Sequence, residues 1–275
     1  MVWIDGRLAD EAEARVSPFD HGLLTGDGVF ETLHVYRGVP FAASRHLDRL
    51  ARSAAGMRLP LPAVDVLADA MHQVVAANAV VDGRLRITVT GGPGPLGSDR
   101  GDAGPTVIVA SAPPASWPAV TDVVVVPWPR NDRGALSGLK TVSYGENVVA
   151  LAHARDRGAG EALFANLSGN LCEGTGTNVF VGVGGRLLTP PLSSGCLAGI
   201  TRELVLECTD AAEETLPYDV LFTADELFLT STVREVQAVR KVDDHVVGDA
   251  PGPVTAAARA ALVTSMRSSG PRKRR

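Results

Sequence analysis

Several residue types are scarce in this sequence, and each scarcity excludes a class of protein. The three cysteines, Cys172, Cys196 and Cys208, are an odd number without CxxC spacing, so neither a disulfide framework nor a zinc site is indicated. The six histidines show no spacing typical of metal ligands. We therefore expect no metal site.

The sequence also lacks a positive net charge and long apolar runs. The 26 Lys and Arg residues against 31 Asp and Glu give a formal net charge of −5, which argues against a nucleic-acid partner. The one basic cluster lies in residues 269–275, which we expect to be a disordered tail. No apolar run reaches ~18 residues, and the N-terminus does not resemble a signal peptide. We expect a cytoplasmic protein without a membrane partner.

Lysine is the scarcest charged residue, with Lys140, Lys241 and Lys273 as its three occurrences. Lys140 stands in an apolar and glycine-containing stretch, Ser137-Gly138-Leu139-Lys140-Thr141-Val142. A lysine amine can lose its proton and form a Schiff base, whereas an arginine cannot. Lys140 is therefore a candidate catalytic residue; the alternative is a surface lysine in an arginine-rich composition.

Strand and helix patterns are mixed along the 275 residues, of which 45% are hydrophobic. Alternation and β-forming residues predict strands, and helical spacing of apolar residues predicts helices. The strands are expected at 29–36, 84–90, 106–112, 122–127, 161–166, 178–183, 186–189, 226–230 and 235–242, and the helices from an N-cap at Ser44, at 62–79, at 144–157 with Val148 and Val149 facing inward, from Gly199, and at 254–266. Because most of these strands are joined by hairpins, the fold class is α+β.

A proline-rich segment, Ala112-Pro113-Pro114-Ala115-Ser116-Trp117-Pro118, predicts a domain boundary, since proline interrupts sheets and stiffens linkers. We expect a small N-terminal α+β domain over 1–112, a linker over 113–121 and a larger C-terminal domain over 122–268.

The segment Gly92-Pro93-Gly94-Pro95-Leu96-Gly97 matches the dinucleotide-binding pattern GxGxxG. The residues that follow it cannot form the helix whose N-terminus would bind a pyrophosphate. We reject this motif and expect a mobile loop over 92–104, which could serve as an active-site lid.

Three segments after Lys140 supply complementary chemistry. Glu173 precedes a glycine- and threonine-rich turn, Gly199 opens a helix whose first N–H groups suit a phosphate, and hydroxyl groups end the strand that leads to Thr232. An ordinary hairpin, an ordinary helix start and ordinary β-propensity are the alternatives. Together with Lys140, the three segments match the aldehyde, the ring nitrogen and the phosphate of pyridoxal phosphate.

The same segments carry a family resemblance. From about Ile4 to Val239 the chain resembles the class IV aminotransferases, the fold-type IV pyridoxal-phosphate enzymes, which include branched-chain and D-amino-acid aminotransferases and 4-amino-4-deoxychorismate lyase. The matching motifs are Asp20-His21-Gly22, Gly26 to Thr32, His46 to Leu50, Lys140-Thr141, Ser143-Tyr144, Asn147, Glu173-Gly174, Asn178 to Phe180, and Gly199 to Arg202.

This resemblance implies a two-domain architecture like that of D-amino-acid aminotransferase, with a larger domain that binds pyridoxal 5'-phosphate, and a homodimer in which a loop of the neighbouring subunit borders the active site. It also implies residue roles. Lys140 is the Schiff-base lysine, Glu173 pairs with the ring nitrogen, Tyr144 lies near the ring hydroxyl, and the phosphate is bound by Arg49, Ile200, Thr201 and Thr232.

Phe30, Arg84 and Arg86 are the candidate substrate residues. The resemblance places Phe30 where D-amino-acid aminotransferases carry a tyrosine, and places Arg84-Leu85-Arg86 where branched-chain enzymes carry Tyr-x-Arg. Because Arg84 and Arg86 are two apart on a strand, they share a face and suit a substrate with two carboxylates.

We therefore expect a lyase that converts aminodeoxychorismate to 4-aminobenzoate and pyruvate, in the folate route. The alternatives are a branched-chain or other amino-acid aminotransferase, an amine transaminase without a carboxylate clamp, and a non-catalytic relative that binds the cofactor.

Overall fold

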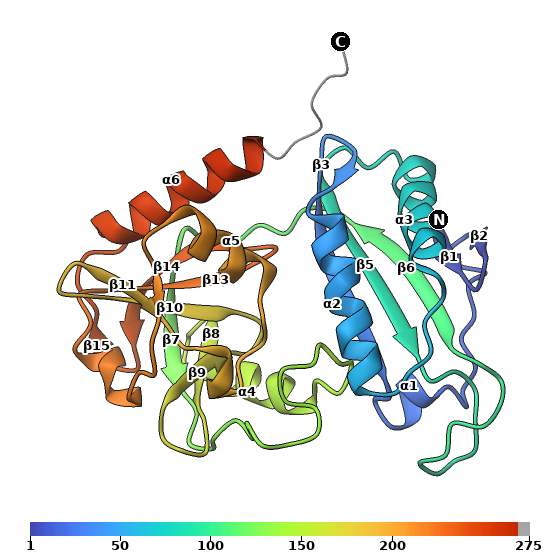
Figure 1. Cartoon of the computed structure of the whole chain (residues 1–275), viewed down its shortest axis with the longest axis horizontal. Coiled ribbons are helices and arrows are strands. Elements are labelled where there is room, and N and C mark those ends of the chain that lie inside the picture. Colours follow the sequence, from blue (N-terminus) through green and yellow to red (C-terminus); the bar gives the residue numbers. More distant parts are fainter. Residues whose placement is uncertain (269–275) are drawn as a thin grey trace. The chain divides into compact units, whose positions relative to one another are not determined.

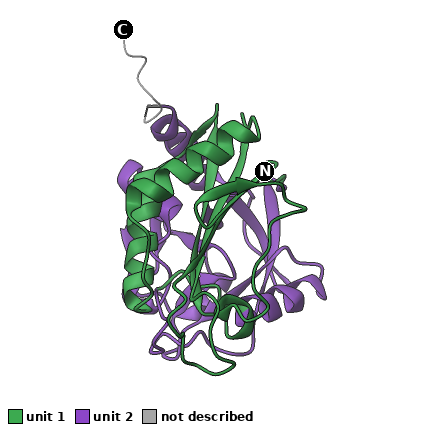
Figure 2. Ribbon diagram, turned by 90° about the vertical axis from the view of Figure 1, so that its right-hand side faces the viewer, with its two compact units in different colours: residues 1–116, 139–144 green, residues 117–138, 145–275 purple. Residues whose placement is uncertain are grey.

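The computed structural model describes residues 1–268; the tail predicted over 269–275 lies outside them. The chain forms two compact units (Figure 2). Unit 1 comprises Met1–Ser116 and Leu139–Tyr144, and unit 2 comprises Trp117–Gly138 and the chain from Gly145 onward. The first change of unit falls within the expected linker. Residues 139–144 belong to unit 1 again, and no shift in composition along the chain predicts this.

Unit 1 is built on a six-stranded sheet of order β2-β1-β6-β5-β3-β4, in which every paired neighbour is antiparallel (Figure 1). Asp5-Gly6 and Arg37-Gly38 make its two tight hairpin turns, with positive φ at each of these residues. The strands are β1 (Val2–Ile4), β2 (Arg7–Ala9), β3 (Gly28–Tyr36), β4 (Val39–Pro40), β5 (Gly83–Thr90) and β6 (Thr106–Ala112).

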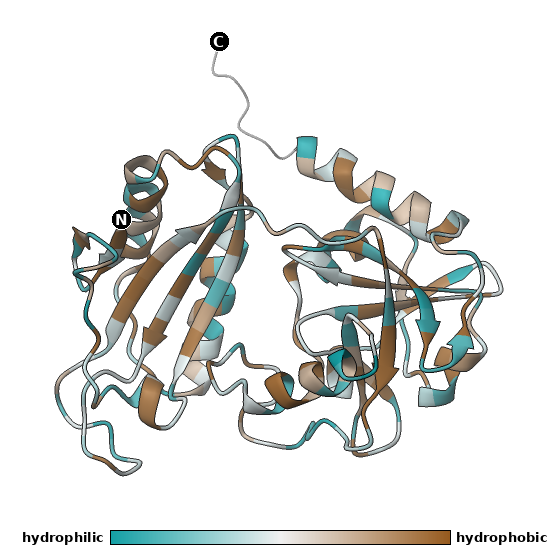
Figure 3. Cartoon of the chain, turned by 180° about the vertical axis from the view of Figure 1, so that it is seen from behind, coloured by the Kyte–Doolittle hydropathy of each residue, from teal (hydrophilic) through white to brown (hydrophobic). Residues whose placement is uncertain are grey.

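One face of this sheet packs on helices α2 (Ala43–Gly56) and α3 (Val64–Ala77). Apolar residues at alternate positions of β3 and β5, among them Leu33 and Leu85, join the helices in one core. Brown segments alternate with paler ones along the strands of this sheet in Figure 3. Phe30, Arg84 and Arg86 lie at the intervening positions, on the opposite face. Helix α2 begins after Ala42 with no side-chain cap, so the predicted N-cap at Ser44 is wrong. A short helix, α1 (His21–Leu24), precedes β3.

Unit 2 contains a nine-stranded mixed sheet. Its path is β12-β11-β10-β13-β14-β7-β8-β9, with β15 on β14; β7 lies parallel to both β14 and β8. The strands are β7 (Val120–Val125), β8 (Glu161–Ala165), β9 (Leu171–Gly174), β10 (Asn178–Val183), β11 (Arg186–Thr189), β12 (Ala212–Glu213), β13 (Glu226–Ser231), β14 (Glu235–Val242) and β15 (His245–Val246).

The helices of unit 2 are α4 (Gly145–Arg155), α5 (Ile200–Cys208) and α6 (Pro253–Ser268), with short 3₁₀ turns η1 (Leu192–Ser194) and η2 (Tyr218–Phe222). Helix α4 corrects a prediction, because Val148 and Val149 are 64% and 58% exposed whereas Ala150 and Ala154 are fully buried. These two alanines join the core that includes Ala162 and Phe164 of β8.

The described part of the chain has no helix with the length and hydropathy needed to cross a bilayer. Within the same residues, no three His, Cys, Asp or Glu side chains gather in a way that could hold a metal ion. The three cysteines are free thiols, and burial raises the pKa of the Cys196 thiol to about 12.

Candidate active site

The segment that carries Lys140 is docked onto the first residues of β3. The Phe30 N–H donates to the Lys140 carbonyl at 3.1 Å, and the Val142 N–H donates to the Gly28 carbonyl at 2.9 Å. The Lys140 N–H donates to Ser53 Oγ of α2 at 3.0 Å. A side chain at Gly28 would collide with the next strand, since a Cβ there would lie 2.7 Å from the Val89 carbonyl oxygen. The backbone of Lys140 is thus fixed on both sides.

Phe30 is the centre around which the reactive side chains of unit 1 gather. Its ring, on a residue only 5% exposed, has Lys140 Nζ 4.4 Å and Arg86 Cζ 3.8 Å from its centroid. The Tyr144 ring meets it edge-on, with centroids 5.2 Å apart. The face of an aromatic ring attracts cations. The arrangement therefore places an amine and a guanidinium together, where a carboxylate next to an amino group could be bound.

Arg84 and Arg86 share a face of β5, as predicted, but their side chains take different partners. Arg86 opposes Thr32 of β3 in register, and its Nε donates to Thr88 Oγ1 at 3.0 Å. Arg84 instead donates from Nε to the carbonyl of Pro113, just beyond β6 on the other side of β5, at 2.9 Å. One arginine of the pair, Arg86, therefore lies over Phe30.

Arg49 belongs to a buried polar triad on the helix side of the sheet. Its Nε and Nη2 donate to the two carboxylate oxygens of Glu31, each at 2.7 Å, and Glu31 is fully buried. His46 Nδ1 lies 2.6 Å from Glu31 Oε2. Burial alone would raise the pKa of the Glu31 carboxyl, but the bonds from Arg49 and His46 outweigh it and lower this pKa to about 2. Because an ionised carboxylate only accepts, His46 donates from Nδ1. Burial also lowers the pKa of His46.

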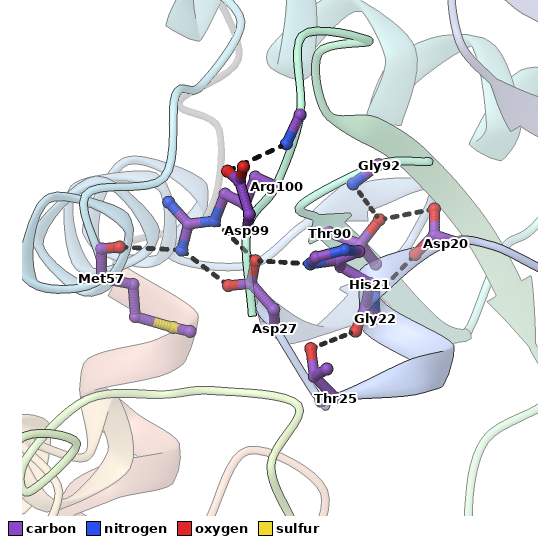
Figure 4. A network of polar contacts seen from close by, with 12 residues as sticks. Asp20, His21, Gly22, Thr25, Asp27, Met57, Thr90, Gly92, Asp99 and Arg100 are labelled. Carbon is purple, nitrogen blue, oxygen red and sulfur yellow. Dashed lines mark hydrogen bonds and ion pairs between the residues drawn. The ribbon is translucent and has the colours of Figure 1, made fainter. Parts of the chain in front are cut away.

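The loop over 92–104 is anchored to the rest of unit 1 (Figure 4). Arg100 makes a two-bond ion pair with Asp27, at 2.5 and 2.6 Å, and also donates to the carbonyls of Met57 and Arg58 at the end of α2. The buried His21 contacts the Pro95 carbonyl through Nε2 at 2.9 Å. The sequence predicts a mobile loop here, and the structure shows contacts that anchor it at Pro95 and Arg100.

Glu173 lies on β9 in unit 2, opposite Phe164 of β8. Its Oε2 accepts from the Leu197 N–H at 2.9 Å, and its Oε1 lies 3.5 Å from Arg130 Nε. Because the side chain is only 14% exposed, the neighbouring cation acts on it with little screening. Arg130 therefore places a positive charge directly beside the Glu173 carboxyl group.

Arg130 was not predicted, because it lies in an irregular segment with no motif. Its guanidinium stacks on the Phe164 ring at 4.0 Å, and its Nη1 donates to Asn147 Oδ1 at 2.8 Å and to Glu146. Its Nε and Nη2 are buried without a hydrogen bond. Arg130 is thus held by packing and by one nitrogen, next to Glu173.

The start of α5 has the features of a phosphate site. Gly199 precedes the first helical residues, Ile200 and Thr201, in an extended conformation and without a side-chain cap. A Cβ on Gly199 would lie 1.9 Å from Asn178 Oδ1, so only glycine fits there. Thr232 follows the last residue of the neighbouring strand β13, on which Thr230 has a buried hydroxyl without a hydrogen bond. Uncapped helix N–H groups and the helix dipole suit a bound phosphate.

The predicted site residues therefore fall into two sets. Lys140, Phe30, Arg49, Tyr144, Arg84 and Arg86 belong to unit 1, and Glu173, Ile200, Thr201 and Thr232 belong to unit 2. Their chemistry fits pyridoxal phosphate: an amine for the aldehyde, an anion for the protonated ring nitrogen and an uncapped helix start for the phosphate.

Comparison with known proteins agrees with this chemistry. The family model described as amino-transferase class IV matches residues 28–242. The chain is 36% identical over 258 residues to a putative branched-chain-amino-acid aminotransferase of Methanocaldococcus jannaschii, with 90% of each chain covered. It is 31% identical over 272 residues to an aminodeoxychorismate lyase of Bacillus subtilis, covering 94% of this chain and 92% of the relative. A hypothetical aminotransferase from Mycobacterium tuberculosis, solved in its PLP-bound form, superposes with a TM-score of 0.86 at 25% identity, over 98% of this chain and 99% of that one.

The chain belongs to the class IV aminotransferase family. It has the mixed helix-and-sheet fold of the fold-type IV enzymes, and the cofactor of the family is pyridoxal phosphate.

Proposed function

We propose that the protein is a pyridoxal-phosphate-dependent aminotransferase that acts on α-amino acids. The observation that carries the proposal is the position of Arg86, whose guanidinium lies on the Phe30 ring beside the Lys140 amine. An α-amino acid has its carboxylate one carbon from the group that reacts, so a carboxylate-binding arginine must stand near the lysine. Arg86 meets this requirement within unit 1.

The roles of the remaining residues follow from their chemistry. The bound cofactor would supply an electron-withdrawing ring that makes the proton next to the substrate nitrogen acidic. Lys140 removes that proton from the substrate and returns a proton in the second half of the reaction. Glu173 would accept from the protonated ring nitrogen. Arg49, Ile200, Thr201 and Thr232 would bind the phosphate, and Tyr144 would lie near the ring hydroxyl.

Aminodeoxychorismate lyase is the second candidate. It is supported by the likeness to the lyase of Bacillus subtilis and by Arg84, which shares a strand face with Arg86 and could meet a second carboxylate. We place it second because the Nε of Arg84 donates to the Pro113 carbonyl, on the side of β5 away from Phe30. Arg84 is therefore not directed toward Phe30 and Arg86. This reverses the order that the sequence favoured.

We also propose that the protein is a homodimer. Val148 and Val149 on α4 are exposed apolar residues in unit 2, and Phe19 and Leu23 are 53% and 70% exposed in unit 1. Within each unit, exposed apolar side chains close together in the sequence are surface of the kind that an interface buries.

A paired assay tests the reaction. The purified protein is offered amino acids with 2-oxoglutarate, and separately aminodeoxychorismate. We expect glutamate from the first mixture and neither 4-aminobenzoate nor pyruvate from the second. Release of both products from aminodeoxychorismate without amino transfer would establish the lyase instead. The protein should be yellow, and both Lys140→Ala and borohydride should remove its visible absorbance; a colourless protein after incubation with the cofactor would end the proposal.

Arg86→Ala tests the proposed carboxylate contact, with Arg84→Ala as its matched control. We expect the Arg86 variant to raise KM for amino acids by about tenfold or more, since a charge-assisted bond is worth roughly 1.5–3 kcal/mol. Cofactor affinity should stay within twofold. Equal losses of substrate and cofactor affinity would show that Arg86 has a structural role, and a larger effect of Arg84→Ala would favour the lyase.

A further inference from the structure

Glu161 is a charged residue in the interior of unit 2 that the proposed reaction does not use. It begins β8, in the otherwise apolar run Glu161-Ala162-Leu163-Phe164, and it is fully buried. A buried carboxylate requires several partners to offset its desolvation. The identity of those partners indicates what the residue does.

Most of the partners lie in the turn that follows Glu173. Glu161 Oε1 accepts from the Thr175 N–H at 3.1 Å and from the Thr175 hydroxyl, and Oε2 accepts from Thr177 Oγ1 at 3.3 Å. The turn lies directly on the carboxylate, because a Cβ on Gly174 would be 3.3 Å from the Glu161 carboxyl carbon. Glu161 therefore fixes the chain that leaves Glu173.

The remaining strong partner comes from the turn between β13 and β14. Arg234, whose side chain is 6% exposed, places Nη2 3.1 Å from Glu161 Oε2. Its Nη1 donates to Gln237 Oε1 at 2.9 Å, and its guanidinium stacks on Trp117 at 4.0 Å. Thr232 lies in this same turn, two residues before Arg234. One carboxylate thus joins the turn after Glu173 to the turn that holds Thr232.

A second route leads from the same turn back to Glu173. The Thr175 carbonyl accepts from Asn147 Nδ2, Asn147 Oδ1 accepts from Arg130 Nη1, and Arg130 Nε lies 3.5 Å from Glu173 Oε1. Every member of this chain of contacts belongs to unit 2. The position of Thr175, set by Glu161, is therefore transmitted to the guanidinium next to Glu173.

We propose that Glu161 is a positioning residue for the cofactor, which holds the ring-nitrogen partner Glu173 and the phosphate ligand Thr232 in register with each other. The inference rests on the proposed roles of Glu173 and Thr232. Glu161 does not touch the cofactor; it acts through the two turns, which have no other carboxylate in common among the described contacts.

The test is the dissociation constant of pyridoxal phosphate for Glu161→Gln, measured by titrating the cofactor into stripped enzyme well below the melting temperature of each variant. We expect an increase of at least tenfold, because glutamine has one acceptor oxygen in place of two, so it cannot accept from both Thr175 and Thr177, and its neutral amide forms no ion pair with Arg234. Outer-shell substitutions at metal sites cost a comparable 10–100-fold in affinity.

Glu226→Gln is the matched control. Glu226 is a second buried carboxylate of the same sheet, and it accepts from the Val254 and Thr255 N–H groups at the start of α6, at 3.0 and 2.8 Å. Both variants should lose thermal stability, but Glu226→Gln should change the dissociation constant by less than twofold. Equal changes in the two variants would overturn the proposal and assign Glu161 a structural role.

A milder variant keeps the proposal testable if Glu161→Gln does not fold. The double substitution Thr175→Val and Thr177→Val removes both hydroxyl bonds and leaves the Glu161–Arg234 ion pair; we expect about threefold weaker binding, and unchanged binding would overturn the proposal. Glu173→Gln distinguishes the two levels of inference. If Glu173→Gln leaves cofactor binding and turnover unchanged, the proposed function of Glu173 fails. If it impairs them while Glu161→Gln does not, only the positioning role of Glu161 fails.

Discussion

The Glu31 triad makes the stability of unit 1 depend on pH in a defined window. The pKa of Glu31 falls from 4.5 to about 2 on folding. Since one pKa unit is worth about 1.4 kcal/mol, the shift of about 2.5 units means that the triad stabilises the ionised form by roughly 3.5 kcal/mol. For an acid with a depressed pKa, this stabilisation is fully present above 4.5 and is lost as the pH falls from 4.5 toward 2. The lowered pKa of His46 adds a separate loss that begins as the pH falls below its unfolded value of 6.5.

The perturbation is Glu31→Gln. At pH 6 it should reduce the free energy of unfolding of unit 1 by about 3–5 kcal/mol, because the Glu31 carboxylate no longer offsets the buried positive charge of Arg49. The difference between wild type and variant should then shrink as the pH falls below 4.5, because the wild type loses the same carboxylate by protonation.

Unit 1 can be monitored separately in urea unfolding. The chain has three tryptophans, and Trp3 lies buried in the core of unit 1, whereas Trp117 and Trp128 belong to unit 2. In a Trp117→Phe and Trp128→Phe background the fluorescence therefore reports unit 1. Asp69→Asn, at an exposed position of α3, is the control. It should change the free energy of unfolding of unit 1 by no more than ~0.5 kcal/mol at any pH tested. A wild-type-to-variant difference that stays constant from pH 6 to 3.5 would refute the reasoning.

Three further predictions concern the site and its surroundings. Arg130→Met should lower cofactor affinity and kcat/KM, because Glu173 loses the ion-pair partner that holds its carboxylate in place. In a Glu173→Gln background the same change should have little further effect, and equal losses in both backgrounds would contradict this role. Arg100→Met should release the 92–104 loop and speed its cleavage by protease about tenfold, and an unchanged rate would show that the anchor is dispensable. Val148→Asp with Val149→Asp should convert a dimer to monomers in light scattering, whereas a monomeric wild type would exclude the proposed homodimer.

The strands were predictable because alternation and turn residues are local signals. Residues 106–112, 178–183, 186–189 and 235–242 form strands with the predicted bounds. The face of α4 was not predictable in the same way. Composition favours burying the valines, but the helix instead buries Ala150 and Ala154 in a core whose other members, such as Val124 and Phe164, are distant in the sequence.

The candidate site residues also divide into those with a local sequence signal and those defined by contacts between distant residues. Lys140 and Glu173 could be proposed from local context and motif spacing, and the family they indicated is confirmed. Arg130 could not, since its meaning lies in an ion pair with a residue 43 positions away. Glu161 had a usable signal, a charge at the head of an apolar strand. The expected two-carboxylate substrate rested on the shared face of Arg84 and Arg86, but strand periodicity gives the face of a residue and not the partner of its side chain.

The return of residues 139–144 to unit 1 has a consequence for cutting the protein in two. A fragment that ends at Ser116 contains Phe30 and its strand but lacks Lys140, and a fragment that begins at Trp117 contains Lys140 but lacks the strand on which it is fixed. Neither fragment therefore contains Lys140 together with the strand that fixes it. Gene fission, domain shuffling or separate expression at the proline-rich linker would separate the residues of the candidate site from one another, although the same cut leaves most of both hydrophobic cores whole.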